Sequence, residues 1–353
     1  MSAVGHRTPV RPAAPVRVDG AGPRPPSAWD IPPPYSLRSV AVVLLVALAA
    51  FFAAQRVEMG RMLALTGEAA LAAVGLRDES QVLSGLDKLA GAMFPLQISE
   101  RTETARIEGF DPGRLPWLSR LEVIETSEPR LDPDTLKMED VRTRREYLVQ
   151  PVGYLRHVAL KMLETIEIAF WATLLAVVLS APLAWCSARN YTFNRATYVT
   201  ARGIVSLLRA VPELISALFL VLAYGFGPIA GVLALALHAC GFLGKFYAED
   251  IETADDKPQE ALRAIGANKL KIMRFAVLPQ VMPQFVAYTL YVLDRNVRMA
   301  TVVGLVGAGG IGQELKGRYD MYQYGHVGTI LVAIFITVFL LDQLAARLRK
   351  RLG

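Results

Sequence analysis

Long apolar blocks separated by charged links dominate the sequence. A helix needs about 20 mostly apolar residues to cross roughly 30 Å of hydrocarbon, because only a helix or a closed barrel satisfies its own backbone there. Six stretches approach that length: Leu37 to Ala54, Leu163 to Ser187, Val199 to Tyr224, Pro228 to Phe246, Phe275 to Leu293 and Val327 to Ala345. The pattern predicts an all-α fold, a polytopic membrane bundle of about six transmembrane helices.

Basic residues predict how these helices cross the membrane. Cytoplasmic links of membrane proteins carry an excess of Lys and Arg. Here the basic residues gather in the amino-terminal tail, in the links after the second and fourth blocks, and at the carboxyl end: Arg7, Arg11, Arg17, Arg24 and Arg38; Arg189, Arg195 and Arg202; Lys257, Arg263, Lys269, Lys271 and Arg274; Arg347, Arg349, Lys350 and Arg351. We therefore expect both termini in the cytoplasm.

The amino-terminal residues 1–36 are rich in Pro and nearly free of large apolar side chains. Such a segment cannot bury enough surface to offset its ordering entropy, so we expect a disordered cytoplasmic tail. The first apolar block, at residues 37–56, resembles a secretory signal, but a preceding tail of about 35 residues is long for one. We favour an uncleaved transmembrane anchor over a cleaved signal.

Residues 57–156 form a long mixed-charge segment, which the topology places in the periplasm or at the membrane interface. Met62 to Leu76 and Val82 to Leu96 have the pattern of amphipathic helices on the membrane or the bundle. The acidic residues around Glu122 and Glu125 fit a solvated face better than a binding site. The sequence assigns no role to this segment.

Composition agrees with a membrane protein, since 53% of the 353 residues are hydrophobic and the net charge is +6. Cys186 and Cys240 lie in predicted membrane helices without paired spacing, and the four histidines form no ligand-spaced group. We expect no metal site and no cofactor in this chain.

The link after the fourth block, within residues 256–279, has a distinctive pattern. It reads EALRAIGANKLKIMRFAVLP from Glu260 to Pro279. Pro258 suits the first turn of a helix, and Gly266 can take the left-handed conformation that ends one. A second short, basic helix follows. Two short helices joined at a glycine corner predict a compact cytoplasmic knob.

This link resembles the coupling loop of the permease family of bacterial binding-protein-dependent ABC importers, which reads E-A-A, three residues, G, nine residues, I, one residue, L-P. The residues that match at this spacing are Glu260, Ala261, Gly266, Leu278 and Pro279, while Leu262 and Ala276 are apolar replacements. In that family the loop inserts into the ATPase. The resemblance therefore implies that these residues couple transport to ATP hydrolysis, within a type I importer permease fold.

Two nucleotide-binding motifs are incomplete. Gly244-Lys245 lacks the rest of GxxxxGK[ST], so we expect ATP and Mg²⁺ on a partner ATPase. The run from Gly307 to Gly312 matches GxGxxG after a strand-like run, Ala300 to Val306, but a dinucleotide fold also needs an acidic residue about 20 positions onward. No Asp or Glu occurs from Met321 to Leu341, where the next apolar block lies.

The glycine run instead predicts a tight backbone passage between the fifth and sixth blocks, because membranes tolerate irregular backbone only where protein or water covers it. In the importer family a glycine-rich segment here borders the outer end of the translocation path. The resemblance thus makes Gly307, Gly309, Gly310 and Gly312 gate candidates. Close packing alone is the alternative.

Further motifs resemble the phosphonate importer permeases over about residues 157–353, with the permease core at 157–350. They are Glu164-Thr165, Arg209-Ala210-Val211-Pro212-Glu213, Gly225-Phe226-Gly227-Pro228, Leu233 to His238 and Asn296-Val297-Arg298. The resemblance implies substrates such as organophosphonates, phosphite or other phosphorus oxyanions.

Ionisable residues inside the fifth block are candidates for the translocation path. Arg295 and Arg298, with Asp294, interrupt an apolar stretch, for which a structural ion pair, guidance of an anion and an interface anchor all fit. About 23 residues at 1.5 Å each bring Arg298 some 34 Å from Phe275. We therefore place Arg298, with its neighbour Asn296, beside the path near its outer mouth.

Arg209 and Glu213 stand one helical turn apart, so each could satisfy the other. His238, in the fourth block, fits a hydrogen-bonded packing residue or a substrate contact. We count all three as weaker candidates for the path.

A transporter subunit, a membrane enzyme and a scaffold all fit a polytopic chain. An enzyme needs a catalytic constellation, and the sequence indicates none. Only a transporter accounts for the basic knob at its fixed distance from Leu-Pro. We expect a non-enzymatic permease in the bacterial inner membrane, whose partners are an ATPase dimer, a periplasmic solute-binding protein, a second permease, identical or related, and lipid, but no nucleic acid.

Overall fold

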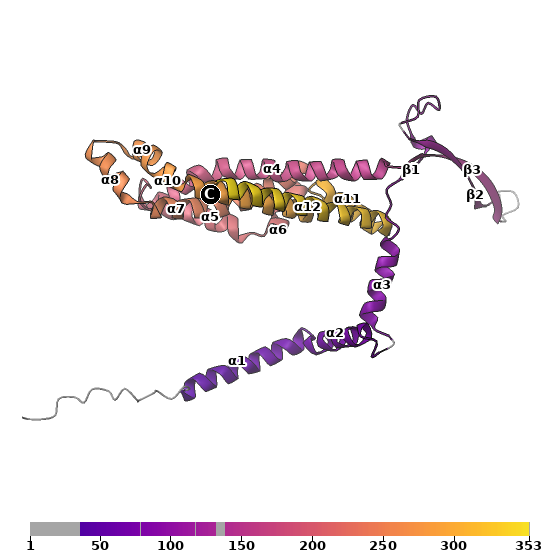
Figure 1. The fold of residues 1–353 in the computed structure, drawn as a ribbon, viewed down its shortest axis with the longest axis horizontal. Coiled ribbons are helices and arrows are strands. Elements are labelled where there is room, and N and C mark those ends of the chain that lie inside the picture. The colour runs from indigo at the N-terminus through magenta and orange to yellow at the C-terminus, as the bar shows by residue number, and fades with distance from the viewer. Residues whose placement is uncertain (1–35, 78, 117, 132–137, 353) are drawn as a thin grey trace, which may run out of the picture. The chain divides into compact units, whose positions relative to one another are not determined.

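The computed structural model describes residues 36–77, 79–116, 118–131 and 138–352 (Figure 1). The predicted disordered tail, apart from Ser36, lies outside these residues. The chain divides into two units, Met1–Gly85 and Leu86–Gly353.

The first unit contains α1 (Leu37–Arg56) and α2 (Met59–Ala73). Ser36 caps α1, since its hydroxyl accepts the backbone N–H of Ser39 at 3.2 Å. The window Arg38–Arg56 is long and apolar enough to cross a membrane, and none of it is buried within the chain. α1 thus has the length and the apolar surface that a membrane anchor requires. The boundary between the units falls within α3 (Gln81–Met93).

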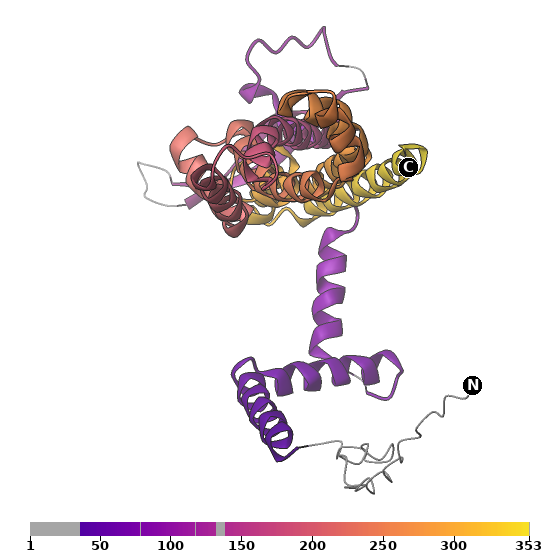
Figure 2. The ribbon, with the colours of Figure 1, turned by 90° about the vertical axis from the view of Figure 1, so that its left-hand side faces the viewer.

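The second unit is a helical bundle, seen along its length in Figure 1 and nearly end-on in Figure 2. Its helices are α4 (Gly153–Ser187), α5 (Arg195–Ala210), α6 (Glu213–Tyr224), α7 (Pro228–Thr253), α8 (Asp256–Ala264), α9 (Lys269–Ile272), α10 (Leu278–Gly304), α11 (Gly310–Asp320) and α12 (Tyr324–Leu352). α7 lies at the centre and packs against α4, α5, α6 and α10. Many buried positions are alanines, among them Ala169, Ala172, Ala234 and Ala300, which allow the helix axes to approach closely.

Membrane-spanning candidates agree with the predicted number. Five described helical segments are long and apolar enough: Arg38–Arg56, Gly153–Ser187, Pro228–Thr253, Lys269–Gly304 and Tyr324–Arg347. α5 and α6 together pass the same test, but they meet at an angle of 90°. Counting this pair as one span gives six, and the predicted fold class, a polytopic helical bundle, is confirmed.

The predicted continuous crossing from Val199 to Tyr224 was wrong in one respect, because it is broken in the middle. Pro212 has no N–H to donate, and its ring disfavours a helical conformation at Val211, which adopts φ −84° and ψ 120°. The middle of α5 lies beside the end of α7, as the 2.9 Å bond from Arg202 to Glu252 shows. α6 ends three residues before Gly227, the N-cap residue of α7. The pair therefore connects the two ends of α7.

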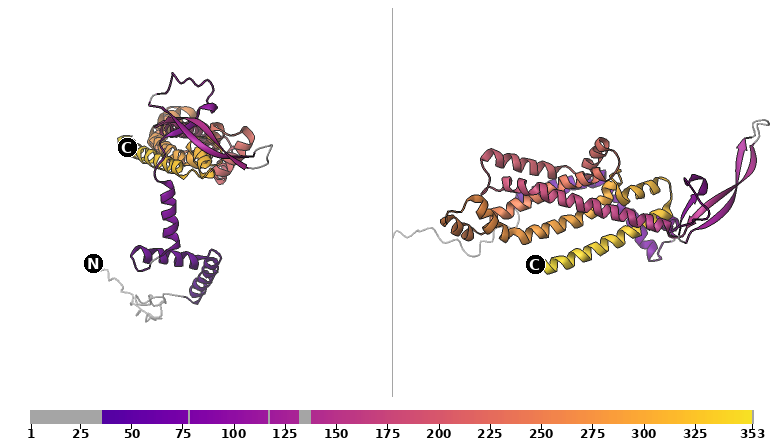
Figure 3. Two further views of the ribbon diagram at one scale, coloured as in Figure 1. Left: turned by 90° about the vertical axis from the view of Figure 1, so that its right-hand side faces the viewer. Right: turned by 90° about the horizontal axis from the view of Figure 1, so that it is seen from above.

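A three-stranded antiparallel sheet, which the sequence analysis did not predict, lies between α3 and α4. Its strands β1 (Glu100–Glu103), β2 (Arg120–Leu131) and β3 (Met138–Gln150) have the order β1-β3-β2. Figure 3 shows the sheet beyond the end of the bundle at which α4 begins, while α8 and α9 lie at the opposite end. These are called the sheet end and the knob end below.

Candidate functional site

The link predicted as a knob consists of two short helices joined at Gly266. The side chain of Asp255 caps α8 by accepting the N–H of Lys257 at 3.1 Å, and Asn268 caps α9 by accepting the N–H of Lys271 at 2.9 Å. Gly266 has φ +79°, and its N–H donates to the carbonyl of Arg263. The predicted left-handed glycine corner is therefore present.

One buried glutamine fixes the knob to the bundle. Gln259 is 1% exposed, and its amide donates to the carbonyls of Ala254 and Asp255 at 3.3 and 3.1 Å. Its Oε1 accepts the hydroxyl of Tyr191 at 2.6 Å. Tyr191 follows α4 and Ala254 follows α7, so this side chain ties α8 to the ends of two long helices.

The knob is also continuous with a long helix. A π-helical turn, Met273–Val277, joins α9 directly to α10, so one helical segment runs from Lys269 to Gly304. The backbone N–H of Asp255 donates to Gln280 Oε1 at 2.9 Å, which holds the start of α8 against the start of α10. The knob and α10 are therefore mechanically connected.

The surface that the knob exposes is partly apolar. Ile265 is 79% exposed and Leu270 66%, and the motif residues Glu260 and Ala261 are also exposed. Of the other motif residues, Leu278 is half-buried against the core and Pro279 begins α10. Exposed apolar side chains beside a carboxylate suit a protein docking surface.

The predicted glycine passage forms a tight turn between α10 and α11, at residues 304–312, which we call the glycine turn. The left-handed positions are Gly307 (φ +91°), Gly309 (φ +86°) and Gly310 (φ +69°). A Cβ on Gly312 would overlap the carbonyl oxygen of Thr301 on α10. The strand-like run from Ala300 ends in helix α10, which removes the βαβ context of a dinucleotide site.

Residues from several motifs far apart in the sequence meet at the glycine turn. Glu164 Oε1 accepts the N–H of Gly310 at 3.0 Å, and Thr165 Oγ1 accepts the N–H of Ile311 at 2.8 Å. The N–H of Gly227, just before α7, donates to the carbonyl of Gly307 at 3.0 Å. Two other segments thus satisfy part of the irregular backbone, as a turn at membrane depth requires.

Glu213 does not pair with Arg209, contrary to the prediction. Because the chain breaks at Pro212, Arg209 ends α5 and Glu213 starts α6, and the helical turn that would join them is absent. Glu213 Oε1 instead contacts the guanidinium of Arg295 and lies 3.3 Å from His238 Nε2. Arg209 is exposed.

Arg298 pairs with Asp294, which is one of the predicted alternatives. Its two terminal nitrogens donate to the two carboxylate oxygens at 3.1 and 2.7 Å, and its side chain remains 46% exposed. Asn296 is 1% exposed and donates to Thr173 Oγ1 on α4 at 2.9 Å. Three candidate path residues, Arg295, Asn296 and Arg298, thus lie within one turn of α10.

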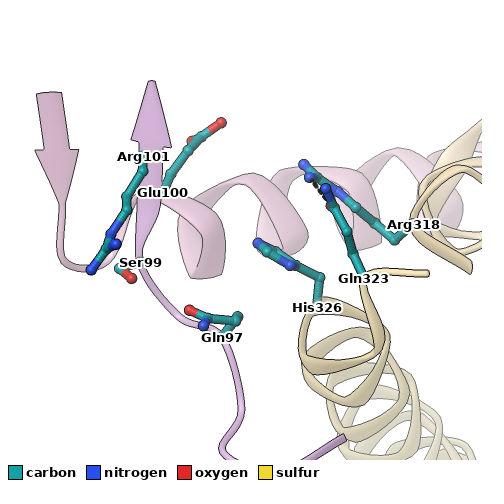
Figure 4. Close-up of a pocket in the computed structure, with 7 residues that line it drawn as sticks. All are labelled: Gln97, Ser99, Glu100, Arg101, Arg318, Gln323 and His326. Atoms are coloured by element: carbon teal, nitrogen blue, oxygen red, sulfur yellow. Dashed lines mark hydrogen bonds between the residues drawn. The ribbon is translucent and has the colours of Figure 1, made fainter. Parts of the chain in front are cut away.

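A polar cavity of about 310 Å³, which the sequence analysis missed, lies at the sheet end. Figure 4 shows Gln97, Ser99 and Arg101 on one side of it and Arg318, Gln323 and His326 on the other. More than 200 residues separate these two groups in the sequence, so no local motif could reveal them.

An ion pair on α11 fixes one wall of this cavity. Arg318 donates to Glu314 Oε1 and to Gln323 Oε1, both at 2.7 Å. Burial alone would raise the pKa of the Glu314 carboxyl, but the hydrogen bond and charge of Arg318 outweigh it and hold this pKa below its ordinary value. No group of three His, Cys, Asp or Glu side chains within the described ranges has the geometry of a metal site.

Comparison with known proteins places the chain in a family. The family model described as "Binding-protein-dependent transport system inner membrane component" matches residues 156–353. A putative phosphite transport system permease protein of Stutzerimonas stutzeri is 60% identical over 262 residues, which cover 74% of this chain and 100% of the relative. A phosphite transport system permease protein of the same organism is 44% identical over 189 residues, 54% of this chain and 69% of the relative.

Two further relatives are more distant. A phosphate-import permease protein of Mycolicibacterium smegmatis is 41% identical over 54% of this chain and 36% of its own length. A chain of a methionine ABC transporter, solved in an inward-facing conformation, is 24% identical over 56% of this chain and 96% of its own, with a TM-score of 0.49. Because the family model covers more than half of the chain, this multi-pass membrane protein belongs to the binding-protein-dependent transport system inner membrane component family.

Proposed function

We propose that this chain is the permease subunit of an ABC importer, and that its solute is phosphite, a phosphonate or a related phosphorus oxyanion. The observation that carries the proposal is the 60% identity along the full length of a relative named as a putative phosphite permease. A second relative is also named for phosphite and a third for phosphate, so the common element of these names is a phosphorus oxyanion.

In this proposal the knob inserts into an ATPase dimer that binds ATP and Mg²⁺, and the chain itself catalyses no reaction. Exposed Ile265 and Leu270 fill an apolar pocket of the ATPase, and Glu260 offers a carboxylate to a basic group. A periplasmic solute-binding protein delivers the anion, and a second permease, identical or related, completes the path within the lipid bilayer.

The translocation path follows α10. The candidates are Asn296 and Arg298, the glycine turn, and Arg209, Glu213 and His238. α10 carries the knob at one end and the glycine turn at the other, which supports a coupling of the two. The glycine turn then serves as the gate on the side of the binding protein.

The test is reconstitution of this permease into proteoliposomes with its ATPase and binding protein. We expect ATP-dependent uptake of phosphite or methylphosphonate that requires all components, and loss of uptake with retained membrane insertion for Glu260→Lys. Uptake of neither probe, with uptake of an amino acid instead, would refute the proposed substrate class.

We further propose that both termini lie in the cytoplasm, as the basic links indicate. A single cysteine replacing Phe110, in the segment between α3 and α4, should react with a membrane-impermeant maleimide in intact cells. One replacing Asn268 in the knob should react only after permeabilisation. The reverse pattern would invert the topology.

A further inference from the structure

Three ionisable side chains meet in the middle of the bundle, where the broken pair α5–α6 approaches α7 and α10. Glu213 is buried, with 8% of its surface exposed, and the side chain of nearby Asp294 is nearly as inaccessible. One of its oxygens, Oε1, faces both Arg295 and His238. A carboxylate on α6 thus lies between an imidazole on α7 and a guanidinium on α10.

His238 faces an acceptor with each of its ring nitrogens. Its Nδ1 lies 3.2 Å from the carbonyl oxygen of Val211, which can only accept. Its Nε2 lies 3.3 Å from Glu213 Oε1, the oxygen that also contacts Arg295. The ring thus lies between the residue before Pro212 and the carboxylate that follows it.

The cluster brings two nitrogen groups to one carboxylate. Arg295 balances the charge of Glu213, and the adjacent pair of Asp294 and Arg298 is neutral in sum. His238 is an additional hydrogen-bonding group beside this ion pair. Ionisable groups buried within membranes usually mark a path for ions or substrates.

The cluster lies at a similar distance from the glycine turn on both long helices. His238 is ten residues from Pro228 at the start of α7, or about 15 Å along the helix. Arg295 is nine residues from Gly304 at the end of α10, or about 14 Å. The start of α7 and the end of α10 are joined at this turn by the bond from Gly227 to Gly307. The Arg295 side chain is 26% exposed, which leaves part of its guanidinium accessible to a ligand.

We propose that Arg295 and His238 form an anion-binding site inside the bundle, about 15 Å from the glycine turn, and that Glu213 is a built-in counter-ion that the passing oxyanion displaces from Arg295. The identity of the anion rests on the proposed function. A phosphorus oxyanion presents paired oxygens that match the fork of a guanidinium, as a carboxylate does. Glu213 therefore competes for the same donors, which keeps binding weak enough for the anion to leave.

A structural ion pair and an anion site predict different results when the charges are exchanged. Glu213→Arg combined with Arg295→Glu restores an ion pair between α6 and α10, but it moves the cation off α10. If the pair serves only to hold the helices together, the exchange restores transport. If Arg295 binds the anion, the exchange restores assembly alone.

The experiment uses the complete transporter in proteoliposomes, with phosphite and methylphosphonate as probes. We expect Arg295→Gln and the exchanged double variant each to lower uptake at least about thirtyfold, and Arg295→Lys to lower it less, since a charge-assisted contact is lost in part. ATPase stimulation by the loaded binding protein should stay within about threefold in every variant. The matched control is Lys245→Gln, two turns further along α7 from His238, which should transport within about twofold of wild type.

Uptake within threefold of wild type by either Arg295→Gln or the exchanged variant would overturn the proposal. If the exchanged variant fails to insert, Arg295→Gln decides alone, with Arg295→Lys as its folding control. A failure of the proposed function can be distinguished from a failure of this site, because the wild-type transporter would then take up neither phosphite nor methylphosphonate. If wild type carries another anion, loss of that uptake in Arg295→Gln still supports the site.

Discussion

Replacement of Gly266 tests the coupling mechanism through backbone geometry alone. This residue has φ +79°, and a Cβ built on it would meet no atom within 4 Å. Steric conflict with neighbours is therefore absent, and any cost comes from the left-handed conformation itself. A β-branched side chain is disfavoured most in that region, whereas Asn tolerates it.

The expected magnitude follows from that conformational cost. Placing a non-glycine residue in the left-handed region costs roughly 1–2 kcal/mol, and 1.4 kcal/mol is a factor of about ten in an equilibrium. Gly266→Val should thus lower the population of the intact corner by roughly five- to thirtyfold, and Gly266→Asn much less. The bundle core is not touched, because Gly266 is exposed.

The assay compares uptake and ATPase activity of reconstituted transporters. We expect Gly266→Val to lose most of its uptake and its stimulation by the loaded binding protein while it still inserts, and Gly266→Asn to retain both. Gly203→Ala on α5, where a Cβ also meets open space but φ is helical, is the control for glycine replacement as such. Equal uptake by the Val and Asn variants would show that the corner plays no part in coupling.

Three other predictions concern the stability of the purified subunit. Gln259→Leu should lower the midpoint of thermal unfolding, because it leaves buried partners, including the Tyr191 hydroxyl, without a hydrogen bond, at about 1–3 kcal/mol each. Gly312→Ala should abolish stable insertion through overlap with the α10 backbone, whereas Gly317→Ala, which meets open space, should be tolerated in an expression and detergent-extraction assay. The Glu314 carboxyl has a lowered pKa in the folded chain, so its contribution is present above its ordinary pKa near 4.5 and is lost as pH falls through the lowered value. Glu314→Gln should flatten that part of a thermal-stability profile against pH, and an unchanged slope would contradict the assigned ion pair.

The helical bundle could be predicted from sequence because the signal is local. A block of about 20 apolar residues specifies a membrane helix without reference to any partner. The knob was also predictable, since Asp255, Gly266 and Asn268 act on backbone groups within a few residues of themselves. The glycine passage followed from the exclusion of its nucleotide-binding alternative.

The remaining features depend on contacts between distant segments. In the sheet, Glu100 pairs with Gln150, and the alternation of strands was obscured by the many charged residues of that segment. Pro212 can be recognised in the sequence as a helix breaker. The direction in which Glu213 then points depends on how α6 packs against α10, and the sequence does not show this packing. The sequence could name Arg295 as unusual but could not identify its partner 82 positions away.

The continuity of α10 with the knob restricts how coupling can work. The helical segment Lys269–Gly304 has 36 residues and is therefore about 54 Å long. Its two ends are held differently: Gln280 fixes the knob end to the start of α8, and the glycine turn fixes the other end to α4 and α7. If this helix moves as a rigid body, a displacement of the knob tilts the whole helix, and the parts farthest from the pivot move the most. Pro283 and the π-helical turn before α10 are its two weak points, because each lacks a regular helical hydrogen bond. Both lie near the knob. In the proposed mechanism, bending there would absorb local adjustment to the ATPase, while the uninterrupted helix beyond Pro283 carries Arg295, Arg298 and the glycine turn as one body.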